Sequence, residues 1–292
     1  MTVVIYLPLL LALPLTFTAR WIAARGTPSV AARGLTAIAV VAAASSTWAL
    51  TLLALTMLDD LPPLSAHDRP GLGLPEPVPG PIALVAGLAL LWGAGRLLAD
   101  VRRRVETHRQ LRAAGAPEHG LVVADWSAPL AVAVPGRPGH LLVTTGILRL
   151  LDADERRVVF AHEHAHLAHR HHRLVAATAA AAALNPLLIP VREAVAYLVE
   201  RWADEEAAAT VGDRDLTAQA VARAALATVG AGPSAALGIN SGAAVLRVQA
   251  LTEPSPAPRR RRLVGPALLG AGFLATSSVA TAEFVMLARA WL

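Results

Sequence analysis

Residues 152–172 read DADERRVVFAHEHAHLAHRHH, which is the most informative part of the sequence. Asp152 is followed three residues later by Glu155, a capping-box pattern that predicts a helix starting directly after Asp152. On that helix His162 and His166 are four residues apart, which places them about 40° from each other around the axis. The stretch therefore predicts a helix with two imidazoles side by side on one face.

His162, Glu163 and His166 form the H-E-x-x-H pattern found in zinc peptidases. Two imidazoles on one face can bind the same tetrahedral zinc ion, and the neighbouring glutamate can accept a proton from the attacking water. The chain has no cysteine, so a metal site must be built from His, Asp and Glu side chains. We therefore expect Zn²⁺ as the cofactor, His162 and His166 as ligands and Glu163 as the general base.

A third protein ligand is required, and two candidates lie further along the chain. Glu200 lies on a helix predicted after Pro186, and Asp204 follows one turn later, where it can orient a ligand histidine. His172 offers the metzincin spacing instead, in which the chain turns at the position that His169 occupies here. Metzincins have glycine at that position, and the helix-favouring sequence after His169 predicts no turn. We therefore expect Glu200 as the third ligand, with His172 as the alternative.

Six of the ten histidines fall between residues 162 and 172, so the stretch could also be a polar or metal-sequestering tract. The capped helix, a β-hairpin predicted within residues 129–145 and the downstream Glu200 favour a peptidase over that alternative. Among the remaining histidines of the stretch, the sequence assigns a role only to His172, as the alternative third ligand, and none to His164, His169 and His171.

The composition is that of a membrane protein rather than a soluble or disordered one. Hydrophobic residues make up 55% and charged residues 16%, with a mean hydropathy of +0.50, whereas soluble domains carry about 25% charged residues. The net charge of +5 comes from arginine, because the sequence has no lysine, and the arginines flank apolar runs. With only 4% aromatic residues, we expect the arginines to mark membrane topology rather than direct binding of nucleic acid.

Apolar runs close to the roughly 20 residues that cross a bilayer predict membrane helices. Four such runs are residues 2–19, 35–58, 81–95 and 263–282. A fifth run, residues 174–191, is interrupted by Asn185, Pro186 and Pro190. We expect one helix to end near Asn185 and a second to begin at Pro186, in contact with the membrane surface, with a full span as the alternative.

Arginines follow the first run, follow the third and precede the fourth, which places these three connections on the cytoplasmic side. The proline-rich segment 59–80 is mainly acidic and is expected outside, as is the N-terminus. We therefore expect a multi-pass protein of the cell membrane with three transmembrane helices in residues 1–95, a cytoplasmic protease domain in residues 96–262 and a C-terminal transmembrane helix in residues 263–292. The expected fold is mainly α, with a zincin-like (gluzincin) α+β domain.

The stretch TTGILRLLDADERRVVFAHEHAHLAHRHH, followed by LNPLLIPVREAVAYLVERWADEEAA, resembles the membrane zinc peptidases of the BlaR/MecR β-lactam sensor-transducer type. It is also similar to the related HtpX and CAAX-prenyl-protease type. The resemblance covers roughly residues 120–225, and the three-plus-one arrangement of membrane helices favours the BlaR/MecR branch. The residues that correspond to the family's zinc ligands, base and supporting acid are His162, His166, Glu200, Glu163 and Asp204.

The resemblance implies cleavage of a cytoplasmic protein, such as a BlaI-type winged-helix repressor, in signal transduction. The sensor-transducers carry a penicillin-binding domain after their last span, whereas ten residues follow residue 282 here, so we expect no such sensor. Two other functions stay open: an HtpX-like protease that degrades damaged membrane proteins, and a non-catalytic signalling protein whose zinc site is structural. The predicted hairpin could offer a strand edge to an extended protein substrate.

Overall fold

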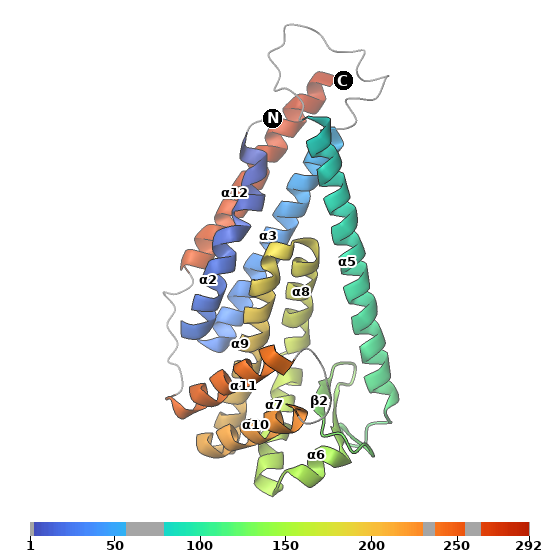
Figure 1. The fold of residues 1–292 in the computed structure, drawn as a ribbon, viewed down its shortest axis with the longest axis vertical. Helices are drawn as coiled ribbons and strands as arrows, with labels where there is room; N and C mark the ends of the chain where they lie inside the picture. The colour runs from blue at the N-terminus through green and yellow to red at the C-terminus, as the bar shows by residue number, and fades with distance from the viewer. Residues whose placement is uncertain (1–2, 57–78, 230–236, 255–263, 292) are drawn as a thin grey trace.

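The structure, a computed structural model, describes residues 3–56, 79–229, 237–254 and 264–291. The molecule is elongated, with long helices at one end and shorter helices with a small sheet at the other (Figure 1). The first end comprises the short elements η1 (a 3-10 helix, Val3–Tyr6) and α1 (Leu7–Leu10) and the longer helices α2 (Ala12–Arg25), α3 (Pro28–Leu55), α5 (Gly80–Ala113) and α12 (Val264–Trp291). We call them the helical bundle.

Within the described residues, four helical stretches are long and apolar enough to cross a membrane: Leu7–Arg25, Pro28–Leu55, Gly80–Ala113 and Leu268–Met286. Each overlaps one of the four runs predicted from the sequence, which confirms that prediction by length and composition. α5 continues without a break past residue 95, where the boundary of the protease domain was predicted. The predicted acidic loop, apart from its last two residues, and the arginines at 259–262 lie outside the described residues.

A small sheet lies at the end of the molecule opposite the chain's first helix. Its three strands in the described part of the chain are β1 (Leu121–Ala124), β2 (Ala131–Val134) and β3 (His140–Thr144), in the order β1-β3-β2. β2 and β3 pair antiparallel, which confirms the predicted hairpin, and β1 adds a parallel strand on the far side of β3. One face of the sheet packs on the end of α5 and the other on α6 (Thr145–Leu150) and α7 (Ala153–Ala168). Because β3 is the central strand, β2 is an edge strand among the described residues.

α7 begins where the capping box predicts. Asp152 Oδ1 accepts hydrogen bonds from the backbone N–H groups of Asp154 and Glu155, at 3.0 and 2.9 Å. In return Glu155 Oε2 accepts one from the Asp152 N–H at 3.0 Å. Three backbone donors at the helix N-terminus are thereby satisfied, which fixes the start of the helix that carries the H-E-x-x-H pattern.

The prediction that the chain makes no turn after His169 was wrong. α7 ends at Ala168, and Arg170 adopts a left-handed backbone conformation with φ of 53°. A non-glycine residue adopts this conformation only at some cost. The turn redirects the chain into α8 (His171–Leu184) and buries the His171 side chain against Trp202.

α8 and α9 (Ile189–Val211) form a hairpin whose tip is the 3-10 turn η3 (Pro186–Leu188). The predicted break between two helices is confirmed, but the tip does not lie at the surface of the bundle. Its hydrogen bonds to the bundle run from Asn185 Nδ2 to Ser46 Oγ at 3.0 Å, from Thr16 Oγ1 to the Leu187 carbonyl at 2.6 Å and from Arg96 Nη2 to the Ala182 carbonyl at 3.2 Å.

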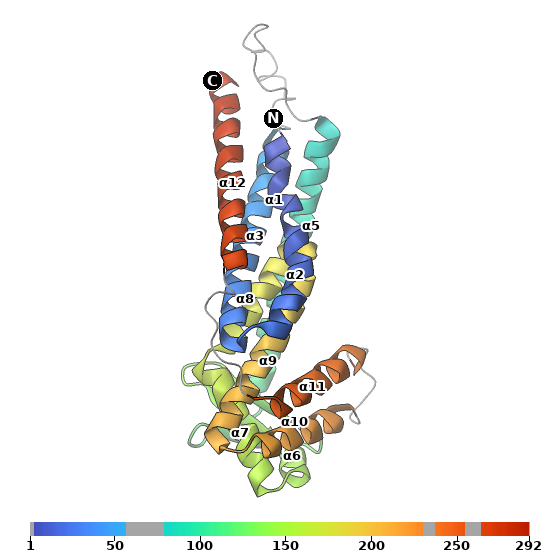
Figure 2. The same ribbon diagram turned by 90° about the vertical axis from the view of Figure 1, so that its left-hand side faces the viewer.

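Both views place this hairpin among α2, α3 and α5 (Figures 1 and 2). The bundle helices surround the hairpin and supply hydrogen-bond partners to polar groups near its tip, the Asn185 side chain and the Leu187 carbonyl. Two further helices, α10 (Arg214–Val229) and α11 (Leu237–Thr252), pack together and contact the lower part of α9.

Candidate metal centre

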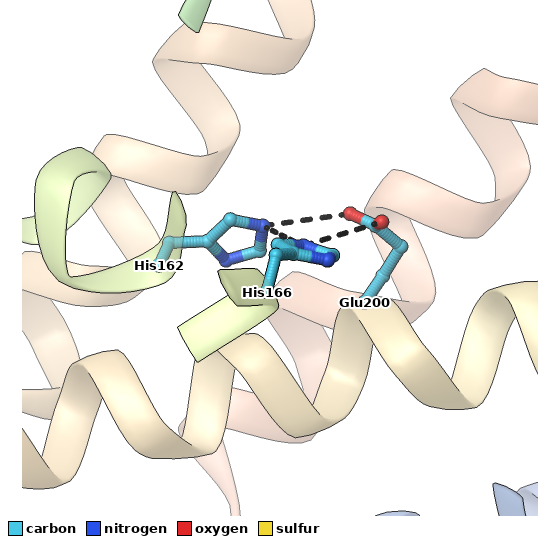
Figure 3. Close-up of side chains that lie close together, drawn as sticks. All are labelled: His162, His166 and Glu200. Atoms are coloured by element: carbon cyan, nitrogen blue, oxygen red, sulfur yellow. Dashed lines mark hydrogen bonds and ion pairs between the residues drawn. The ribbon is translucent and has the colours of Figure 1, made fainter. Parts of the chain in front are cut away.

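α7 and α9 bring together the three predicted ligands, His162, His166 and Glu200 (Figure 3). The two Nε2 atoms of the histidines are 3.1 Å apart. Each lies 3.6 Å from one oxygen of Glu200, His162 from Oε2 and His166 from Oε1. One candidate ligand atom from each residue lies within 4.8 Å of the others, so the three can bind one ion.

These distances fit a tetrahedral zinc ion. With zinc–nitrogen and zinc–oxygen bonds of about 2.0 to 2.2 Å, neighbouring ligand atoms are separated by roughly 3.3 to 3.6 Å. The separation of the two histidine nitrogens, 3.1 Å, lies slightly below this range, and the distance from each nitrogen to its nearer Glu200 oxygen, 3.6 Å, lies at its upper end. Burial lowers the pKa of His166 to about 4, which keeps this imidazole neutral as a ligand must be. The donor set, two imidazoles and one carboxylate, fits a metal ion such as zinc and would leave a fourth coordination position for water or substrate.

Asp204 lies one turn after Glu200 on α9 and contacts the far side of the His162 ring. Its Oδ1 is 3.0 Å from His162 Nδ1, and its side chain is 2% exposed. Burial lowers the pKa of His162, but the contacts with Asp204 and Glu200 outweigh burial and raise it to about 10. At neutral pH such a ring carries a proton on both nitrogens, so a bound metal ion must displace the proton of Nε2, while Asp204 holds the proton of Nδ1.

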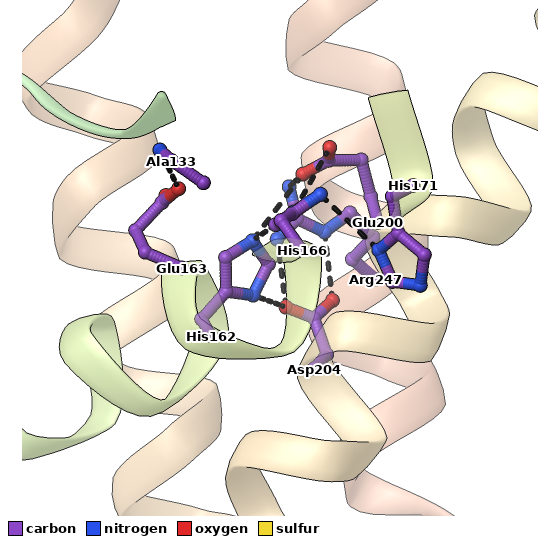
Figure 4. Close-up of polar contacts among 8 residues, drawn as sticks. All are labelled: Ala133, His162, Glu163, His166, His171, Glu200, Asp204 and Arg247. Atoms are coloured by element: carbon purple, nitrogen blue, oxygen red, sulfur yellow. Dashed lines mark hydrogen bonds and ion pairs between the residues drawn. The ribbon is translucent and has the colours of Figure 1, made fainter. Parts of the chain in front are cut away.

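Arg247 on α11 brings a positive charge to the two carboxylates, Glu200 and Asp204. This residue was not identified from the sequence. Its Nε and Nη2 each donate a hydrogen bond of 2.7 Å to Asp204, and its Nη1 lies 3.1 Å from Glu200 Oε2 (Figure 4). Burial would raise the pKa of Asp204, but Arg247 and His162 outweigh it and hold the pKa below its usual range. One guanidinium therefore keeps two neighbouring carboxylates ionised.

A sequence signal for Arg247 does exist. It is the single charged residue in the apolar run from Gly242 to Leu251, GAAVLRVQAL, and such a residue is usually buried with a partner. The signal does not reveal the partner, because Asp204 lies 43 residues earlier in the chain.

Glu163 lies next to the three candidate ligands, but its carboxylate points toward β2 (Figure 4). Its Oε2 accepts a hydrogen bond of 2.7 Å from the backbone N–H of Ala133. Burial raises the pKa of Glu163 to about 7, and the negative charge of Glu200 acts in the same direction. A carboxylate with a pKa near neutrality is suited to take up and release a proton.

Three other histidines of the stretch lie away from the three ligands. His164 is exposed and lines an open groove of about 490 Å³ together with Phe160 and Glu206. His169 stacks on Trp202 with ring centroids 4.6 Å apart. His172, the alternative third ligand, is exposed on the first turn of α8 and is not part of the group that could hold a metal.

His171 is the fourth of these histidines, and it contacts the site from behind. Its Nδ1 is 3.2 Å from Nδ1 of His166, and burial and the neighbouring His166 lower the pKa of His171 to about 3. Sequence spacing could not predict this contact, because five residues along a continuous helix would place His171 about 140° around the axis from His166. The left-handed turn at Arg170 brings the two rings together.

The profile of peptidase family M48 matches residues 98–196, which is 99 of the 292 residues. The matched region contains the H-E-x-x-H pattern and ends before Glu200. No curated protein and no solved structure matches the chain. The match to a peptidase family, the His/His/Glu group and the four apolar helices together support a membrane metallopeptidase.

Proposed function

We propose that this protein is an integral-membrane zinc endopeptidase whose ligands are His162, His166 and Glu200. The observation that carries the proposal is the convergence of these side chains from two helices at the separations that a tetrahedral ion requires. Asp204 supports His162, and Arg247 neutralises part of the acidic charge. The family match supports hydrolysis of peptide bonds as the reaction.

Zinc bound at this site would polarise the carbonyl of the scissile peptide bond and make a water molecule acidic enough to be deprotonated near neutral pH. Glu163 takes the proton of the attacking water and passes it to the nitrogen of the leaving amine. For this it must turn from the Ala133 N–H toward the three ligands, which is a rotation of its own side chain. Its raised pKa suits both proton transfers, because the carboxyl group can gain and lose a proton near neutrality.

The free edge of β2 is the proposed binding surface for the substrate backbone. The Thr144 N–H donates to the Leu130 carbonyl. In this antiparallel pair the backbone N–H and C=O groups of Leu130 and Val132 therefore point toward β3, whereas those of Ala131 and Ala133 point away from it. The outward-pointing N–H of Ala133 donates the hydrogen bond that the Glu163 carboxylate accepts in this structure. A substrate strand pairing with β2 would take over this N–H and release Glu163 for its role as base.

We further propose that the metal site lies on the cytoplasmic side of the cell membrane, with the N-terminus outside. The arginine-rich ends of α2, α3 and α5 lie at the end of the bundle that faces the metal site, as the positive-inside rule requires (Figure 1). The substrate proposed from the sequence resemblance is a cytoplasmic regulatory protein such as a BlaI-type winged-helix repressor.

The proposal is tested by comparing cells that produce the wild-type chain with cells that produce Glu163→Gln, which keeps the shape of the side chain but cannot act as a base. New peptide termini, mapped by mass spectrometry of all cell proteins, are expected with the wild type and absent with Glu163→Gln. Zinc content should be equal in the two purified proteins, because Glu163 is not a ligand.

The identity of the cleaved proteins separates the candidate functions. Cleavage of a few soluble regulators supports the signalling role, whereas cleavage of many misfolded membrane proteins supports quality control. Equal sets of termini in the two cell types, with zinc present in both proteins, would contradict a peptidase and leave a structural zinc site in a signalling protein.

A further inference from the structure

The two ring nitrogens of His166 have different neighbours, because Nε2 faces the candidate metal site and Nδ1 faces the protein interior. Its Nε2 faces His162 Nε2 and Glu200 Oε1, at 3.1 and 3.6 Å. Its Nδ1, on the other side of the ring, is 3.2 Å from Nδ1 of His171 (Figure 4). The ring that binds on one side is thus held on the other side by a second imidazole.

The contact allows one arrangement of protons when His166 acts as a ligand. A ligating Nε2 offers its lone pair to the ion, so the proton of a neutral His166 is on Nδ1. Two nitrogens at hydrogen-bond distance need one donor and one acceptor, so Nδ1 of His171 accepts. The proton of a neutral His171 is then on its Nε2.

Burying the polar ring of His171 has a free-energy cost, which the hydrogen bond to His166 offsets. The residue is 1% exposed, and its Nε2 has no hydrogen-bond partner among the residues that the structure describes. Trp202 and His169 cover the ring, with centroids 4.6 and 5.7 Å away. A phenyl ring would fill the same space without burying an unpaired N–H, so the polar contact that an imidazole adds here is the one to His166.

We propose that His171 is a positioning residue that accepts the hydrogen bond of His166 Nδ1 and so fixes the ring orientation and tautomer of this metal ligand. This inference rests on the proposed zinc site. It assigns different supports to the two ligand histidines: His162 is held by the carboxylate of Asp204, and His166 by a neutral imidazole. A neutral partner increases the basicity of its ligand less than a carboxylate does.

The test measures zinc affinity of the full-length protein in detergent by competition with a zinc chelator of known affinity. His171→Phe keeps a ring of similar size but removes the acceptor, and we expect it to weaken zinc binding by about 10- to 100-fold. His171→Asn places an amide oxygen where Nδ1 lies and should bind zinc nearly as tightly as the wild type. His172→Phe, which changes the exposed neighbouring histidine, is the matched control and should have no effect.

A second readout is the visible absorption spectrum of the cobalt-substituted protein, which reports ligand geometry independently of cleavage. The spectrum should change in His171→Phe and stay close to the wild type in His171→Asn. If His171→Phe does not fold, His171→Gln replaces it, because its longer side chain carries the amide past the position of Nδ1 and should lose zinc affinity while His171→Asn retains it.

Equal zinc affinity and equal cobalt spectra in the wild type and His171→Phe would overturn the proposal, as would equal losses in the Asn and Phe variants, which would indicate packing alone. A wild-type protein that binds no zinc would contradict the proposed function instead. The two failures are therefore distinguishable.

Discussion

The two halves of α9 are stabilised in different ways. The half inside the bundle buries Val191, Val195 and Leu198 completely against small side chains of neighbouring helices. The half at the metal site carries Glu200 and Asp204, whose carboxylates are held by His162 and Arg247. One continuous helix thus depends on close packing at one end and on balanced charge at the other.

This difference predicts two kinds of sensitivity. At the bundle end the size of a side chain should matter more than its charge partners, because packed helices leave no room for added atoms. At the metal-site end the loss of a charge partner should matter more than a change of volume, because a buried carboxylate without a partner is unfavourable. Paired substitutions at the two ends can break or sharpen this comparison.

The largest effect on stability is expected for Arg247→Met, which keeps most of the volume and removes the charge. It leaves the buried carboxylate of Asp204 without its two hydrogen bonds of 2.7 Å, at a cost of about 3 to 5 kcal/mol. Thermal unfolding of the purified protein in detergent measures this loss. Arg157→Met, which breaks the exposed pair with Asp154, is the control and should cost less than about 1 kcal/mol. Similar losses in both variants would show that burial of the pair is irrelevant.

Gly93→Leu should have the next largest effect, at the bundle end. A Cβ atom on Gly93 would lie 3.3 Å from the carbonyl oxygen of Leu184 at the end of α8. A leucine at this position should therefore force the α8–α9 hairpin away from α5. We expect a loss of about 1 to 3 kcal/mol in thermal unfolding. Gly95→Leu, two residues further along α5, has open space around its Cβ atom and should be tolerated. An equal loss at both glycines would contradict close packing of the hairpin.

Asn185→Ala tests the polar contacts of the hairpin tip. The side chain donates to Ser46 Oγ and accepts from the Leu187 N–H, so its removal should cost about 1 to 2 kcal/mol. Thr51→Ala is the control, because Thr51 Oγ1 donates to a carbonyl of its own helix. Zinc affinity should be unchanged in both variants, and a large drop in zinc affinity in Asn185→Ala would show that the two ends of α9 are coupled rather than separate.

The smallest effect is expected for Asp152→Ala at the start of α7. Loss of the capping hydrogen bonds to Asp154 and Glu155 should cost about 1 kcal/mol. Asp154→Ala keeps the cap and should change the unfolding temperature less. If the two variants unfold at the same temperature, the capping box does not stabilise the helix of the metal site.

The features that could be predicted from the sequence are those set by neighbouring residues. The capping box at Asp152, the pairing of His162 with His166 and the hairpin around PGRPG depend on spacings of a few residues. The four apolar runs depend on composition alone. Local rules of helix geometry and hydropathy are sufficient for each of them.

The features that could not be predicted depend on contacts between distant segments. Arg247 is 43 residues from Asp204, and Asn185 is 139 residues from Ser46. The turn at Arg170 contradicts the local helix preference, because burial of His171 and the direction of α8 depend on the rest of the fold. Tertiary contacts outweigh local propensity at these positions.

The most direct test of the central claim is the zinc content per chain of the purified full-length protein, measured by elemental analysis beside Glu200→Gln and His172→Ala. The account predicts one zinc ion per chain in the wild type and in His172→Ala, and much less in Glu200→Gln. Zinc retained without Glu200 but lost without His172, or no zinc in the wild type, would contradict a metal site built from α7 and α9.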